Sequence, residues 1–135
     1  QADFVIIDFE GEPARTLDER RRKHSPLRDV AGMLRSFAYA AETVAARLGA
    51  DHAERAEPLR QAVEAWEQAA RHAFLEGYRA AAADVSSVPA SPDATDQLVE
   101  LFVIEKALYE LRYELDNRPE WVGIPIRGLL RLVNP

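Results

Sequence analysis

Apolar side chains spaced three and four positions apart recur along most of this 135-residue chain, and this spacing constrains its fold more than any other feature. In an α-helix, such positions share one face. The spacing predicts a helix from Ser25 to Leu48, a helical stretch from Asp51 to Ala83, and a third helix that ends at Asn117. The chain is therefore expected to be mainly α.

Serine, proline and glycine residues mark where the first of these helices begin and end. Ser25 and Pro26 combine an N-cap with a proline at the first helical position, and Gly49 supplies a stop. Pro58 is interpreted as a second helix start. The charged stretch 16–24 is either a short solvated helix or a mobile segment.

Similar signals divide the second half of the chain. Residues 85–93 are rich in proline and small or polar residues, which predicts a loop, and Asp93 or Thr95 is expected to cap the next helix. Pro119 ends that helix, because the residue before a proline is disfavoured in the α conformation. A short amphipathic helix over 124–133, opened by Pro125, is expected to follow.

One segment has the composition of a strand. Residues 4–9 are largely β-branched and aromatic, and Gly11 with Pro13 ends the run. The chain enters this strand with no cap or turn before it, and a strand so placed usually pairs with another. We therefore expect the natural protein to continue upstream of Gln1.

Charge and composition narrow the function classes. The net charge of −6 is spread along the chain, which argues against a general nucleic-acid or membrane-surface binder. No apolar run approaches the roughly 18–20 residues of a transmembrane helix. The absence of cysteine excludes thiol catalysis and cysteine zinc sites, and it fits a reducing compartment. A cytoplasmic location is therefore inferred.

Asp8 lies where the predicted strand opens into a turn. Mg²⁺ takes oxygen ligands and uses one or two carboxylates together with substrate phosphates, so a carboxylate at a rigid strand end suits it. The alternative is that Asp8 caps its own turn. Its immediate neighbours leave these two interpretations evenly balanced.

The helix that ends at Asn117 carries two different stripes. An apolar seam with heptad-like spacing is predicted to face the core: Leu101, Ile104, Leu108, Leu111 and Leu115. A second face beside it combines aromatic rings with a cation and an amide: Phe102, Lys106, Tyr109, Tyr113 and Asn117. Such a face can stack on a sugar and hydrogen-bond its hydroxyls. The alternative, a half-buried boundary stripe with a snorkelling lysine, is favoured by these residues alone.

Four segments carry a resemblance that is longer than any single motif: residues 6–15, 23–37, 105–121 and 123–125. Together they resemble the bacterial maltokinases, which belong to the aminoglycoside-phosphotransferase-like branch of the protein-kinase fold. Enzymes of this family transfer the γ-phosphate of ATP to the anomeric hydroxyl of maltose. The resemblance implies that residues 1–135 form the helical C-terminal part of a kinase C-lobe, with one short N-terminal strand and without the N-lobe and catalytic loop.

The resemblance also implies roles for three carboxylates. Asp8 stands where the kinase fold keeps its magnesium aspartate, and Glu10 replaces the usual glycine of that motif. Glu10 either helps bind the metal or serves as a structural carboxylate in the turn. Asp29 matches a buried structural aspartate that braces the catalytic loop, and it is also placed to interact with the helix dipole.

The predicted acceptor site follows from the same family likeness. Lys106, Tyr109, Arg112 and Tyr113 stand in the family's signature on the helical subdomain, so they are expected to bind the sugar. Glu110 and Glu114 are weaker candidates. Trp121 is expected to be a core anchor for the last helix rather than a sugar contact.

The resemblance places the catalytic aspartate in a His-Gly-Asp segment upstream of the strand, so this chain is not expected to transfer phosphate by itself. The implied parent uses ATP, Mg²⁺ and maltose, contains the remaining kinase lobe, and is in some cases fused to trehalose synthase. Its product, maltose 1-phosphate, feeds α-glucan synthesis in this family. Two rivals stay open: another small-molecule kinase of the same branch, acting on aminoglycosides or amino sugars through a more acidic site, and a non-catalytic helical domain that binds a sugar or a partner.

Overall fold

A computed structural model describes Val5, Gly11, residues 15–51 and residues 53–133. All regular secondary structure in these residues is helical, which confirms the mainly α fold class. The predicted strand lies outside the described residues, apart from Val5. The helices are α1 (Leu17–Arg21), α2 (Leu27–Asp51), η1 (Ala53–Arg55), α3 (Ala56–Ala81), α4 (Pro92–Asn117), η2 (Pro119–Trp121) and α5 (Gly123–Val133).

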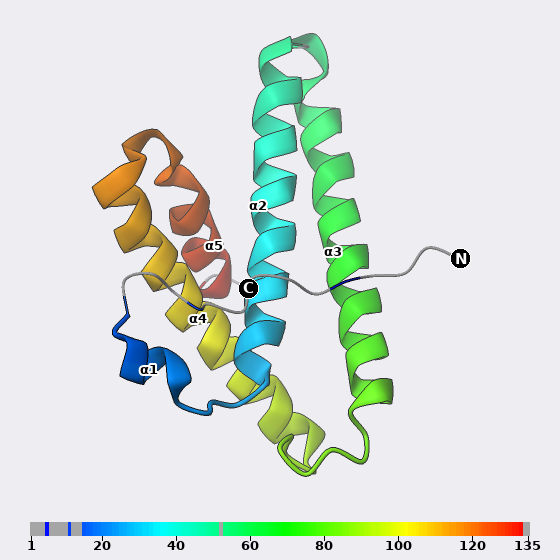
Figure 1. Ribbon diagram of the computed structural model, residues 1–135. Helices are drawn as coiled ribbons and strands as arrows, with labels where there is room; N and C mark the ends of the chain where they lie inside the picture. Colours follow the sequence, from blue (N-terminus) through cyan, green and yellow to red (C-terminus); the bar gives the residue numbers. More distant parts are fainter. Residues whose placement is uncertain (1–4, 6–10, 12–14, 52, 134–135) are drawn as a thin grey trace.

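Helix α2 is the centre of the arrangement (Figure 1). It packs lengthwise against α3 to form a long antiparallel hairpin, and its first half also packs against α4. Helix α5 folds back beside α4 and reaches α2. The result is a helical layer in which α2 contacts each of the other three long elements.

The structure confirms several predicted helix ends and corrects others. Helix α2 starts after Ser25, whose hydroxyl accepts from the Leu27 amide, as the Ser-Pro signal predicted. It ends at Asp51, past the predicted stop at Gly49. Helix α3 already begins at Ala56, because Pro58 occupies the first turn, where a missing amide proton costs no intrahelical bond.

The cap of α4 is Ser91, and the prediction of Asp93 or Thr95 was wrong. The Ser91 hydroxyl accepts from the Ala94 amide, and Pro92 takes the first helical position, which repeats the signal seen at the start of α2. The buried Thr95 hydroxyl donates instead to the Pro89 carbonyl, at 3.2 Å. The helix ends at Asn117, as predicted.

Helix α1 settles the ambiguity over the charged stretch near the start. Thr16 and Glu19 form a capping box, in which each side chain accepts from the other residue's backbone amide. The helix has no buried residue, so the alternative of a short solvated helix is confirmed.

The hydrophobic core lies where α2, α3 and α4 meet. Its buried members are Leu27, Val30, Ala31, Leu34, Val99 and Val103. Phe37 extends it toward α3, where its ring makes edge contacts with Phe74 and Trp66, at centroid distances of 5.8 Å and 6.3 Å. These edge contacts are a favourable geometry for aromatic pairs.

The predicted core-facing seam of α4 was wrong. Leu101, Leu108 and Leu115 are each more than half exposed, whereas Val103 and Ala107 on another face are buried. The reason is that α2 presents polar side chains to α4, and these are met by glutamates of α4 rather than by leucines. The most apolar stripe of α4 is consequently left on the outside of the described structure.

Candidate functional site

The interface between α2 and α4 is a ladder of polar pairs. Since the two helices run in the same direction, partners follow one another in the same order along both. The pairs are Arg28 with Glu105, Arg35 with Glu110, and Tyr39 with Glu114. Their closest contacts measure 2.5, 2.8 and 2.9 Å respectively. Glu110 and Glu114 therefore point inward and hold the helices together.

Burial sets the electrostatics of this ladder. The Arg35 and Glu110 side chains are only 4% and 12% exposed. Desolvation raises the pKa of Glu110, and the neighbouring Arg35 guanidinium opposes that rise. Glu114 is almost fully buried and also accepts two bonds from Arg118, at 2.8 and 2.7 Å. Each inward-facing carboxylate is thus matched by donors.

The ionisation of Tyr39 provides an ultraviolet absorbance signal that reports on this ladder. Burial, followed by its hydrogen bond to Glu114, raises the pKa of the phenol above its ordinary value. The stabilisation from this neutral phenol is present below the unfolded pKa near 10 and is lost as pH rises through the folded pKa. An ultraviolet titration measures phenolate formation. In Tyr39→Phe, the phenolate signal that is lost should therefore be the part that the native protein develops at the highest pH. Loss of signal near pH 10 would contradict this assignment.

A second set of side chains, from α4 and from the residues that follow it up to the end of η2, forms a column on another face. The Lys106 ammonium lies 4.8 Å from the Tyr109 ring centroid, and the Tyr109 and Tyr113 rings are nearly parallel, at 6.5 Å and 20°. The Arg118 guanidinium lies over both Tyr113 and Trp121, at 5.4 and 5.1 Å. We call these five residues the cation–aromatic column.

The column brings together three of the four predicted sugar ligands. Arg112 is exposed and makes none of these ring contacts. Arg118 and Trp121 were not predicted as members. The four-residue spacing from Glu114 to Arg118 was the available signal, because an i,i+4 ion pair fixes the guanidinium beside Tyr113.

The column limits how a sugar could approach. Lys106 and Arg118 each lie over a ring that would otherwise offer its face to a ligand. A sugar would therefore meet ring edges, tyrosine hydroxyls and ammonium or guanidinium donors, with Tyr113 the most open ring at 44% exposure. These groups suit neutral hydroxyls and repel a cationic ligand.

The structure does not test the predicted metal carboxylates. Asp8 and Glu10 lie outside the described residues, and within the described ones no group of three or more His, Asp or Glu side chains is placed to hold a metal ion. Asp29 is exposed in the first turn of α2, and its expected role of bracing a catalytic loop stays a prediction. Its exposed position fits the alternative, a carboxylate near the positive end of the helix.

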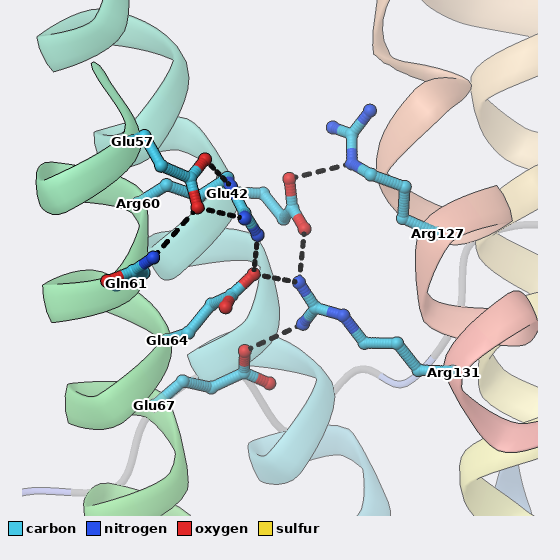
Figure 2. A network of polar contacts seen from close by, with 8 residues as sticks. All are labelled: Glu42, Glu57, Arg60, Gln61, Glu64, Glu67, Arg127 and Arg131. Atoms are coloured by element: carbon cyan, nitrogen blue, oxygen red, sulfur yellow. Dashed lines mark hydrogen bonds and ion pairs between the residues drawn. The ribbon is translucent and has the colours of Figure 1, made fainter. Parts of the chain in front are cut away.

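A third polar cluster joins α2, α3 and α5 (Figure 2). Arg131 reaches across from α5 and contacts three carboxylates, Glu42, Glu64 and Glu67, at 3.1–3.3 Å. Arg127 and Arg60 add a second cation to Glu42 and Glu64. Sequence reasoning missed this cluster, because its members come from three helices and no spacing within one helix shows which helices meet.

No helix among residues 15–51 and 53–133 combines the length and the apolar character needed to cross a bilayer.

Comparison with known proteins places the chain in a kinase-like context. Over 131 residues it is 28% identical to a glucosamine kinase from Streptacidiphilus jiangxiensis, and the match covers 96% of this chain. The chain spans about a quarter of that relative, with 27% of its length aligned. No protein-family model matches the chain. The similarity supports a kinase-like relationship to a sugar kinase, without pointing to maltokinase in particular.

Proposed function

We propose that this chain is the C-terminal helical part of an ATP-dependent sugar kinase and carries the acceptor-sugar face. The observation that carries the proposal is the match to a sugar kinase over nearly the whole chain. The mainly helical fold is compatible with the helical half of a kinase C-lobe. On this proposal, the N-lobe, the catalytic loop and the ATP site belong to the rest of a longer protein.

The proposed acceptor is maltose, and the parent product is maltose 1-phosphate. The charge of the cation–aromatic column supports a neutral sugar, since Lys106 and Arg118 are its only charged members. The nearby Glu110 and Glu114 carboxylates already accept hydrogen bonds from Arg35, Tyr39 and Arg118. Mg²⁺ would be held by Asp8, with Glu10 as a second candidate, and trehalose synthase is a proposed fusion partner.

An amino sugar is the second candidate acceptor, because the similar Streptacidiphilus protein is named a glucosamine kinase. An amino sugar carries a basic amine, which in its protonated form would be repelled by Lys106 and Arg118 unless carboxylates from elsewhere in the parent approach it. A non-catalytic sugar- or partner-binding domain is the third alternative.

Calorimetric titration of the 135-residue chain separates these candidates. We expect saturable maltose binding in the millimolar range, weaker binding of glucosamine, and about a tenfold loss of maltose affinity in Tyr109→Ala, which corresponds to one aromatic contact. Leu108→Ala is the matched control, because Leu108 is an exposed residue of the same helix outside the column. Tighter binding of glucosamine than maltose would favour the amino-sugar alternative, and equal losses in both variants would contradict the assigned face.

A further inference from the structure

A cavity of about 310 Å³ lies between α2, α3 and α5, beside the Arg131 cluster. Its wall combines apolar side chains with charged groups of both signs. The positive groups are Arg35, Arg71 and Arg131, and the negative groups are Glu42, Glu64 and Glu67. A polar cavity of this size is large enough for a small ligand or for several waters.

The carboxylates of this wall are already matched. Arg131 contacts all three, at 3.1–3.3 Å, as Figure 2 shows. Glu42 has a second partner in Arg127, and Glu64 has one in Arg60. A cationic ligand would have to displace these arginines, so the cavity does not offer a site for a cation.

Two arginines of the wall, Arg35 and Arg71, have guanidinium groups that are not fully hydrogen-bonded to described residues. Arg35 is 3% exposed and its Nε donates to Glu110, but its Nη2 is buried with no hydrogen-bond partner among the described residues. Arg71 is half-buried, and neither a hydrogen bond nor an ion pair joins it to another described residue. A buried donor without a partner is costly, and a half-buried guanidinium without a hydrogen-bonded acceptor also loses part of its solvation.

The electrostatics agree with this geometry. Desolvation lowers the pKa of Arg71, Glu67 opposes that change, and the nearby Arg35 and Arg131 guanidinium groups lower the pKa further. The formal charges of the wall balance, and Arg71 is the arginine of the wall that no hydrogen bond ties to a described carboxylate.

We propose that this cavity binds a small oxyanion, a carboxylate or a phosphate, through Arg71 and Arg35. A planar guanidinium offers paired donors that match the oxygens of either group. Such a ligand would supply hydrogen-bond acceptors to Arg71 and to the unpaired donor of Arg35. The inference uses no residue of the cation–aromatic column, so it stands or falls separately from the proposed sugar site.

The test is thermal unfolding of the 135-residue chain at constant ionic strength, with chloride replaced by 10 mM phosphate or 10 mM acetate. We expect one or both anions to raise Tm by about 5 °C, a shift typical of millimolar binding to a small domain. Arg71→Gln should abolish the rise. Arg47→Gln, which removes an exposed arginine elsewhere on α2, should retain it.

Phosphate also has a general stabilising effect on folded proteins, and the comparison of the parent with the two variants controls for it. A rise confined to phosphate identifies a phosphate site, and an equal rise with acetate identifies a site for either oxyanion. Equal rises in the parent and in Arg71→Gln, or no rise with either anion, would overturn the proposal and leave a water-filled cavity. Arg71→Gln is expected to fold, because Arg71 makes no hydrogen bond to other described residues. Broadening of the ³¹P resonance of phosphate, lost in Arg71→Gln, would check the result independently.

Discussion

Arg35→Met is expected to lower the free energy of unfolding by about 3–5 kcal/mol, because it leaves Glu110 buried without its counter-charge. The Arg35 Nε lies 2.8 Å from a Glu110 carboxylate oxygen, and both side chains are almost entirely removed from water. Methionine fills much of the volume of arginine, so the main loss is electrostatic. Urea denaturation of the parent and the variant measures the difference.

A second substitution separates charge from packing. Replacing both partners, Arg35→Met with Glu110→Leu, should restore most of the lost stability, because a buried ion pair exchanged for apolar groups is often close to neutral. Arg60→Met is the control, since its pairs with Glu57 and Glu64 are exposed and should contribute little. If Arg35→Met were no more destabilising than this control, the ladder between α2 and α4 would not hold the helices together.

Gly128→Ala is expected to destabilise the chain by about 1–3 kcal/mol through overpacking. A methyl group at Gly128 would overlap the Arg35 guanidinium, whose Cζ would be 3.0 Å away and whose Nη1 would be closer still. Arg35 is fixed by Glu110 and cannot simply move aside. The absence of a side chain at this position of α5 is thus what lets the guanidinium lie between α2 and α5.

Gly77→Ala supplies the opposite expectation at a matched helical glycine. A methyl group there meets nothing within 4 Å, so alanine should raise the free energy of unfolding by about 0.5–1 kcal/mol through its higher helix propensity. The cost of Gly128→Ala should also shrink when Arg35 is replaced by alanine. Equal gains from both glycine substitutions would contradict the position of Arg35.

The helix ends were the most predictable part of the fold. Ser25-Pro26 and Pro119 act through local backbone chemistry, so they could be recognised without tertiary information. Ser91-Pro92 carries the same signal and was missed, because Asp93 and Thr95 compete as caps a few residues later. Only the structure shows that the Thr95 hydroxyl is used by the Pro89 carbonyl.

The orientation of α4 could not be predicted from its own sequence. Hydrophobic periodicity favours the side that carries Leu101, Leu108 and Leu115, and that side is exposed in the described residues. The inner face is decided by Arg35 and Tyr39 of α2, which are about 75 positions away along the chain. Such pairings depend on which helices pack together, and no spacing within one helix contains that information.

The candidate site was also predictable only where it depends on spacing within one helix. Lys106, Tyr109 and Tyr113 lie at helical spacing, so their common face was predictable, and the structure brings them into one column. Arg112 follows the family signature but not this geometry. The positions of Arg71 and of the Arg131 cluster relative to each other depend on how three helices meet, so they could not be predicted from the sequence.

The most direct test of the proposed sugar-kinase function is the kinase activity of a longer polypeptide that contains this chain together with an N-lobe and catalytic loop. On the proposed function it should phosphorylate maltose with ATP and Mg²⁺, and Asp8→Asn should lower kcat on the order of 100-fold or more, because Asp8 is the proposed anionic ligand of the metal. Asp18→Asn, in the solvated helix α1, should keep the parent rate. Near-normal maltose phosphorylation in Asp8→Asn would contradict the proposed role of Asp8, and phosphorylation of glucosamine with none of maltose would contradict the proposed acceptor.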